Sequence, residues 1–129
     1  MNQSLTEPVL HKEHPLILSS RVVKTPVFNR AGERIGHVDD LSIGKVDGKV
    51  IYAIMSFGGF LGIGEKFHPL PWSLLDYDIE RGGFIVPLDR PALENAPQYT
   101  LDELRALGGA DYREAVFGYY GPFGVAPYW

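Results

Sequence analysis

Residues 58–72 read Gly-Gly-Phe-Leu-Gly-Ile-Gly-Glu-Lys-Phe-His-Pro-Leu-Pro-Trp, and this stretch decides the fold. Four glycines fall within its first seven residues, and glycine lets the backbone adopt positive φ and pass close to other backbone. Two prolines flank Leu70 and interrupt a regular hydrogen-bonded ladder, because proline lacks an N–H. The apolar run 50–57 leads into it and has the composition of a central strand. The pattern predicts a shaped loop between two barrel strands and does not favour a catalytic loop.

Short strand-like segments and tight turns continue on both sides of this loop. The expected strands cover residues 21–28, 34–43, 50–57, 67–70, 72–79 and 84–88. Turns are expected where asparagine, aspartate and glycine gather, at 29–33, 45–49 and 80–83. About six short strands within about 70 residues predict a mainly β fold, a small antiparallel barrel whose closure removes exposed strand edges.

The chain divides into three regions. Residues 1–18 are polar and broken by proline, and we expect a loose arm or a segment that orders only against a partner. Residues 19–98 form the expected barrel domain, which ends in an irregular connector over 91–98. Residues 99–129 form a C-terminal extension, in which Thr100-Leu-Asp-Glu103 has the form of a capping box before a short helix to about residue 107. Asp111 is expected to cap a second helix to about Phe117.

The overall composition is that of one soluble globular domain. The chain has 129 residues, of which 45% are hydrophobic and 22% are charged. Its net charge of -4 and the absence of any lysine or arginine run argue against nucleic acid as the main partner. The sequence contains no cysteine, which excludes disulfides and thiolate chemistry. No apolar run approaches the roughly 20 residues of a membrane helix, and the N-terminus lacks signal-peptide features, so we expect a cytoplasmic protein without membrane insertion.

Three segments carry a resemblance to a known family. They are Val27-Phe-Asn-Arg-Ala-Gly-Glu-Arg-Ile-Gly-His-Val-Asp-Asp40, the glycine-rich stretch 58–72, and Gly83-Phe-Ile-Val-Pro-Leu-Asp-Arg90. Together they resemble the PRC-barrel domain, the small β-barrel of the photosynthetic reaction-centre H subunit and of the ribosome maturation factor that binds a small-subunit ribosomal protein. The resemblance covers roughly residues 17–98, and the tail 119–129 is similar to that of stand-alone bacterial members. The resemblance implies a barrel that binds other macromolecules, and it implies no catalytic residues. We do not transfer to this chain the specific role of the reaction-centre subunit or of the ribosome maturation factor.

Each histidine can be interpreted either as a chemical group or as a structural one. His11 and His14 are three residues apart, a spacing that suits two metal ligands on one helical turn, but no third ligand accompanies them. His37 and Asp39 are expected to share a strand face, either as a metal or acid–base pair or as an exposed pair on the barrel wall. His68 lies in the family-like loop, where it makes a pH-sensitive hydrogen bond or simply satisfies loop backbone groups.

Two further patterns have a chemical and a structural interpretation. Asp76, Asp78 and Glu80 alternate, so they could hold a cation or form a solvated outer face. The glycines before Lys66 superficially resemble a phosphate loop, but Glu65 intervenes and no Gly-Lys-Ser/Thr opens a helix. A structural glycine loop is therefore the better interpretation.

The C-terminal tail is unusually rich in aromatic residues. Aromatic side chains dominate the energetics of protein interfaces, and each buries about 150–250 Å². A small barrel core has little room for them, so they cover an open end of their own barrel or are buried on another subunit. The residues concerned are Tyr112, Phe117, Tyr119, Tyr120, Phe123, Tyr128 and Trp129.

We therefore expect a non-catalytic protein-interaction or assembly module that needs no cofactor or metal. It is expected to self-associate, with a dimer favoured, and to bind an unidentified protein partner. The alternative is a small-ligand or metal-binding protein that uses the loop 58–72, with His68 and Glu65 in its site. The residues expected to form the contact surface are Gly59, Gly62, Gly64, His68, Pro71, Trp72, Tyr119, Tyr120, Tyr128 and Trp129.

Overall fold

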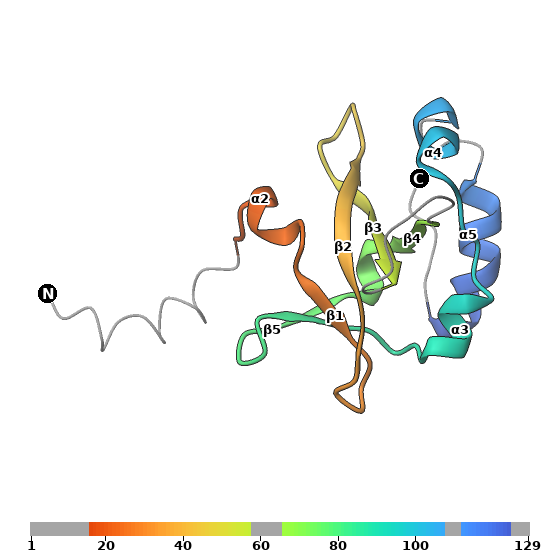
Figure 1. The fold of residues 1–129 in the computed structure, drawn as a ribbon. Helices are drawn as coiled ribbons and strands as arrows, with labels where there is room; N and C mark the ends of the chain where they lie inside the picture. The colour runs from red at the N-terminus through yellow and green to blue at the C-terminus, as the bar shows by residue number, and fades with distance from the viewer. Residues whose placement is uncertain (1–15, 58–65, 108–111, 125–129) are drawn as a thin grey trace, which may run out of the picture.

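The computed structural model describes residues 16–57, 66–107 and 112–124, which form a mainly β domain with short helices (Figure 1). The predicted glycine loop over 58–65, residue Asp111 and the end of the tail lie outside the described residues. The elements in chain order are α2 (Ser19–Val22), β1 (Pro26–Phe28), β2 (Arg34–Ile43), β3 (Val50–Phe57), β4 (His68–Pro71), the 3-10 turn η1 (Trp72–Leu74), β5 (Asp76–Asp78), β6 (Gly83–Ile85), α3 (Arg90–Glu94), α4 (Leu101–Leu107), α5 (Arg113–Tyr120) and the 3-10 turn η2 (Gly121–Phe123).

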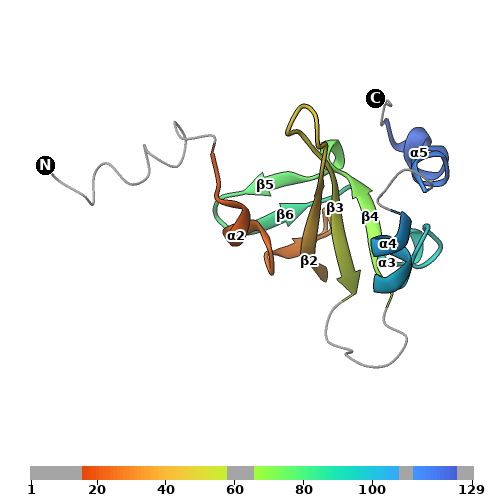
Figure 2. The ribbon, with the colours of Figure 1, turned by 90° about the horizontal axis from the view of Figure 1, so that it is seen from above.

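The six strands form one hydrogen-bonded sheet in the order β4-β3-β2-β1-β6-β5. Neighbouring strands are antiparallel except β1 and β6, which run parallel with Val27 opposite Phe84. The prediction of a wholly antiparallel sheet is wrong for this pair, because β6 reaches β1 by a long path through β4 and β5 rather than through a hairpin. Among the described strands, β4 and β5 remain the two edges of the sheet, and η1 joins them across residues 72–75. The sheet therefore coils so that its two edges come within reach of this short connection (Figure 2).

A bulge at Asp39 bends the longest strand. Val38 lies opposite Met55 and Asp40 lies opposite Ile54, so Asp39 is an extra residue on β2. Residues that are opposite each other in an antiparallel pair share a face, so the bulge shifts the alternation by one residue beyond this point. A strict alternation along β2 would place Ile35, Leu41 and Ile43 on one face, but Ile35 is buried, Leu41 is half-buried and Ile43 is exposed.

Strand β3 is buried on both faces. Ala53 and Met55 face the inside of the coiled sheet, where they lie opposite Leu70 and His68 of β4. Tyr52 and Ile54 are also buried, on the face covered by the C-terminal helices (Figure 1). The helices and the sheet contribute to one hydrophobic core, which includes Val116 and Tyr120 of α5. The extension that begins at residue 99 is thus packed onto the sheet rather than set apart from it.

Several local predictions are confirmed. The turns contain Gly32, Gly48 and Gly82, each at positive φ, as expected for tight connections. The capping box before α4 forms as predicted: the Glu103 amide donates to Thr100 Oγ1 over 3.1 Å, and the Thr100 amide donates to Glu103 Oε1 over 2.8 Å. The hydrogen bond from the Thr100 amide holds the pKa of the Glu103 carboxyl below its usual value.

Several segments differ from the sequence prediction. The strand expected over 21–28 begins only at Pro26, and residues 19–22 form the helical turn α2, in which the Arg21 and Val22 amides donate back to the Leu18 carbonyl. The connector after residue 90 contains α3, which Asp89 caps by accepting a hydrogen bond from the Ala92 amide over 2.9 Å. Helix α5 continues to Tyr120, three residues beyond the expected end. Strands are expected over 72–79 and 84–88, but the structure has shorter strands in these places, β5 (Asp76–Asp78) and β6 (Gly83–Ile85).

Candidate functional site

His68 is a buried structural histidine in the described structure. Its side chain is fully buried on β4, opposite Met55. The imidazole hydrogen-bonds the backbone at Pro97, and since proline has no N–H, the ring donates to the Pro97 carbonyl oxygen. Burial lowers the pKa of His68 to about 4, although this hydrogen bond acts in the opposite direction. The ring is therefore neutral at pH 7, and the backbone group that acts on it, at Pro97, lies outside the loop 58–72.

The other residues expected from the loop lie in different environments. Pro71 is buried at the end of β4, so it does not reach the surface. Trp72 is half-buried and packs edge-on against Phe84 with ring centroids 5.6 Å apart. Only Trp72, of the described loop residues predicted to form the contact surface, keeps an exposed part. Gly59, Gly62, Gly64 and Glu65 lie outside the described residues.

The described part of the aromatic tail packs on its own domain. Tyr120 is fully buried, and burial raises the pKa of its hydroxyl. Tyr119 is half-buried and donates a hydrogen bond from its hydroxyl to the Ala92 carbonyl of α3 over 2.6 Å. The predicted contact role is therefore wrong for Tyr120, because its side chain already fills the core. Tyr128 and Trp129 lie outside the described residues.

A cluster of aromatic rings joins β3 to α5. Tyr112 lies 5.5 Å from Tyr52 and 5.1 Å from Tyr99, measured between ring centroids, and Phe117 lies 6.2 Å from Tyr52. Burial raises the pKa of the tyrosines in this cluster, which keeps their hydroxyls neutral. The cluster attaches the C-terminal helices to the sheet.

The structure brings a serine, a histidine and an aspartate together on β2 and β3. His37 Nε2 lies 3.0 Å from Asp39 Oδ1, which confirms that these two side chains share a face, and 3.3 Å from Ser56 Oγ. A catalytic triad uses both ring nitrogens, one for the serine and the other for the acid. Here both partners meet the same nitrogen, and Ser56 is fully buried. The trio stabilises the strand pair and cannot relay a proton to a substrate. Sequence reasoning missed Ser56, which only the register places opposite His37.

Of the three carboxylates considered for a cation, Asp78 closes a turn and the other two are exposed. Asp78 Oδ1 accepts from the Glu80 and Arg81 amides over 3.0 and 3.2 Å, which closes the β5–β6 turn. Asp76 and Glu80 are exposed. Within residues 16–57, 66–107 and 112–124, no group of three metal-binding side chains gathers. His11 and His14 lie outside these ranges.

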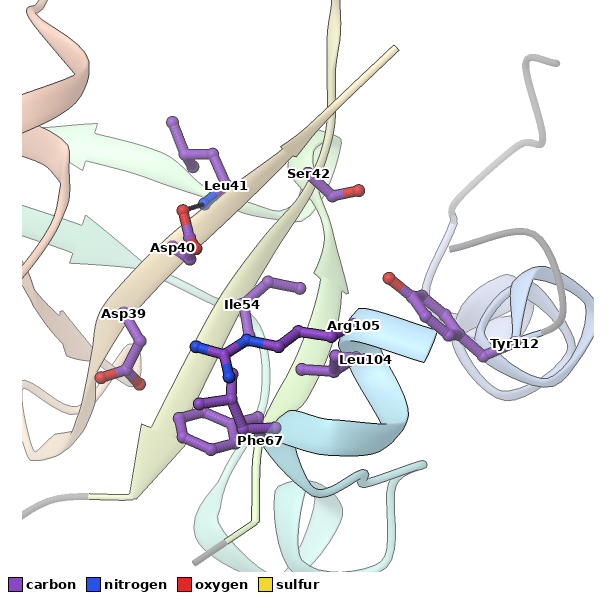
Figure 3. Close-up of a pocket in the computed structure, with 10 residues that line it drawn as sticks. Asp39, Asp40, Leu41, Ser42, Ile54, Phe67, Leu104, Arg105 and Tyr112 are labelled. Atoms are coloured by element: carbon purple, nitrogen blue, oxygen red, sulfur yellow. Dashed lines mark hydrogen bonds between the residues drawn. The ribbon is translucent and has the colours of Figure 1, made fainter. Parts of the chain in front are cut away.

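A hollow of about 460 Å³ lies between β2 and α4. Figure 3 shows Arg105 reaching into it from α4, while Tyr112 stands at one side with its hydroxyl toward Ser42. The hollow was not predicted, because its walls come from segments 60 residues apart in sequence. Its lining combines apolar and charged side chains: Asp39, Asp40, Leu41, Ser42, Ile54, Phe67, Leu101, Leu104, Arg105 and Tyr112.

A coiled mixed sheet with its edges joined by a short turn, and with helices on one face, defines a small barrel-like β-domain. The model of the PRC-barrel domain family matches residues 15–93, and the chain belongs to this family. The match spans the sheet, while α4 and α5 lie beyond it. No curated protein matches the chain.

The helices in the described part of the chain are short. None of them has both the length and the apolar character that a membrane span requires.

Proposed function

We propose that this PRC-barrel protein is a non-catalytic, cytoplasmic interaction module that self-associates. The observation that carries the proposal is an uncovered apolar run directly before α2. Leu16, Ile17 and Leu18 are 87%, 42% and 72% exposed, although a folded domain normally buries such side chains. Three consecutive exposed apolar residues are typical of a surface that another molecule covers.

The described side chains offer less support for an enzyme. The strongest catalytic candidate, Ser56 with His37 and Asp39, has the wrong nitrogen geometry and a buried serine. A ligand or metal site at the loop 58–72 also gains no support from His68, which is buried and hydrogen-bonded to backbone. Family membership and the exposed run together favour an interaction module over an enzyme.

The proposal is tested by sedimentation velocity of the purified chain over a wide concentration range. We expect the wild type to form species larger than the 14.4 kDa monomer as concentration rises. The double variant Leu16→Ser/Leu18→Ser should remain monomeric, because it removes most of the apolar area that association would bury.

A matched control removes exposed apolar side chains elsewhere. Val46 lies in the β2–β3 hairpin and Ile79 in the β5–β6 turn, and both are exposed. Val46→Ser/Ile79→Ser should associate like the wild type. A wild-type chain that stays monomeric at every concentration would contradict the proposed self-association.

A further inference from the structure

The hollow between β2 and α4 has mainly apolar walls, with acidic side chains on its β2 side and Arg105 reaching into it from α4. Ile54, Phe67 and Leu104 are buried or half-buried side chains that line it. Leu101, at the start of α4, also lines it and is 43% exposed. An apolar concavity of this kind loses contact with water when an apolar side chain fills it.

The size of the hollow matches the exposed run 16–18. An apolar cavity of about 150 Å³ holds one benzene molecule, a group somewhat larger than a leucine side chain. The hollow of about 460 Å³ therefore holds about three such side chains. The same chain carries three uncovered aliphatic residues in a row, Leu16, Ile17 and Leu18.

Charge is complementary between the two features. Asp40 lies on the β2 side of the hollow and is exposed. Arg21 is exposed one helical turn after Leu18, since its amide donates to the Leu18 carbonyl over 2.8 Å. Among the residues that line the hollow, Asp39 and Asp40 outnumber the one cation, Arg105. When the apolar run occupies the hollow, Arg21 can therefore approach Asp40.

A chain does not place its own run in its own hollow in this fold. Residues 16–18 directly precede α2, and α2 and α4 lie on opposite sides of β2 in both ribbon views (Figures 1 and 2). If the run fills a hollow of this kind, the hollow therefore belongs to a second copy. Two different surfaces then meet, which makes the contact heterologous, or head-to-tail.

We infer that the hollow between β2 and α4 binds the Leu16–Ile17–Leu18 run of a second copy of this chain. This inference rests on the proposed self-association and names its two complementary surfaces. One copy supplies the apolar run with Arg21, and the other supplies the apolar walls with Asp40.

The test uses one variant for each surface. Leu16→Ser/Leu18→Ser, the run variant, replaces two apolar side chains of the run with polar ones, so the run can no longer bind an apolar surface. Leu101→Glu places a charge at the mouth of the hollow, and an acidic residue in the first turn of a helix is compatible with folding of α4. The control Ala106→Glu adds the same charge at an exposed position of α4 that does not line the hollow. Circular dichroism and thermal unfolding confirm that each variant is folded.

Native mass spectrometry then measures assembly of each variant and of an equal mixture, with one variant isotopically labelled. Leu16→Ser/Leu18→Ser (the run variant) and Leu101→Glu (the hollow variant) should each be monomeric when measured alone. Ala106→Glu should assemble like the wild type. The mixture should form a 1:1 complex that grows no further, because the hollow of the run variant still accepts the run of the hollow variant. A mixture that stays monomeric would overturn the inference.

A second result separates this inference from the proposed function. If the run variant loses assembly but Leu101→Glu keeps it, the run binds elsewhere; self-association then stands and the hollow assignment fails. If the wild type does not assemble at all, both fail.

Discussion

Gly36 lies on β2 where the neighbouring strand β3 is too close to leave room for a side chain. A Cβ at this position would overlap the backbone oxygen of Ser56 and lie 2.5 Å from Met55 Cε. The obstacle includes backbone of a central strand, which cannot move without disturbing the sheet. Gly36 is one of the glycines in the segment that carried the family resemblance, and the structure supplies the steric reason for it.

We expect Gly36→Ala to lower the free energy of unfolding by about 1–3 kcal/mol through overpacking. Gly118→Ala is the matched control, since a methyl group added there would meet no neighbouring atom within 4 Å and the residue lies on α5. That change should stabilise the protein by about 0.5–1 kcal/mol, because alanine loses less backbone entropy in a helix. Urea unfolding of both variants measures the two effects, and equal stabilities would contradict the steric account.

At the scale of elements, capping groups decide where the short helices begin. Helix α4 has seven residues, too few to be stable by propensity alone. Thr100 and Glu103 satisfy each other's backbone amides at its start. The capping pattern spans four residues and depends only on them, so the sequence could predict it. Helix α3 was missed although Asp89 precedes Arg90-Pro91, a combination of an N-cap residue with proline in the first turn that could have revealed it.

We expect Thr100→Ala to destabilise the domain by about 1 kcal/mol and to increase hydrogen exchange in the first turn of α4. Thr100→Ser keeps the hydroxyl acceptor and serves as the control. Mass-spectrometric hydrogen exchange and urea unfolding provide the two measurements. Identical behaviour of the alanine and serine variants would show that the cap does not hold the helix.

The bulge at Asp39 is the element-scale feature that alternation could not reveal. A period of two residues predicts faces correctly only while the register is continuous. One extra residue moves the side chains from Asp40 to Ser42 to the opposite faces, which brings Asp40 and Ser42 toward α4. Part of one wall of the hollow therefore depends on this single insertion.

At the scale of the whole molecule, the helices and the coiled sheet share one core, and His68 lies within it. Its folded-state pKa of about 4 is below the value of about 6.5 expected for an unfolded chain. The unfolded state therefore binds a proton first as the pH falls. The stability associated with the neutral ring is complete above pH 6.5 and is lost progressively toward pH 4.

Between about pH 7.5 and pH 5 this titration should lower the free energy of unfolding by about 2 kcal/mol. His68→Gln retains an N–H donor for the Pro97 carbonyl but has no titrating ring. We expect the pH dependence of the variant to be smaller by about this amount over the same range. Urea unfolding at several pH values measures it, and parallel curves for wild type and variant would contradict the assignment.

The sequence by itself determined the features that depend on neighbouring residues. It predicted the turns with Gly32, Gly48 and Gly82 and the capping box of α4. It also indicated the central strand β3 and the contact between His37 and Asp39. Each of these follows from backbone freedom, hydrogen-bonding groups or periodicity within a few positions, so no information about distant segments was needed.

Only the tertiary structure decided which distant surfaces meet. The parallel pairing of β1 with β6, the burial of Tyr120, the Pro97 partner of His68 and the hollow between β2 and α4 join segments that are far apart in the chain. The physical reason is that apolar burial is not directional: an aromatic tail is stabilised equally by any apolar surface of suitable shape. The path of the whole chain selects that surface, and here it places the described part of the tail on the domain's own sheet and leaves residues 16–18 exposed.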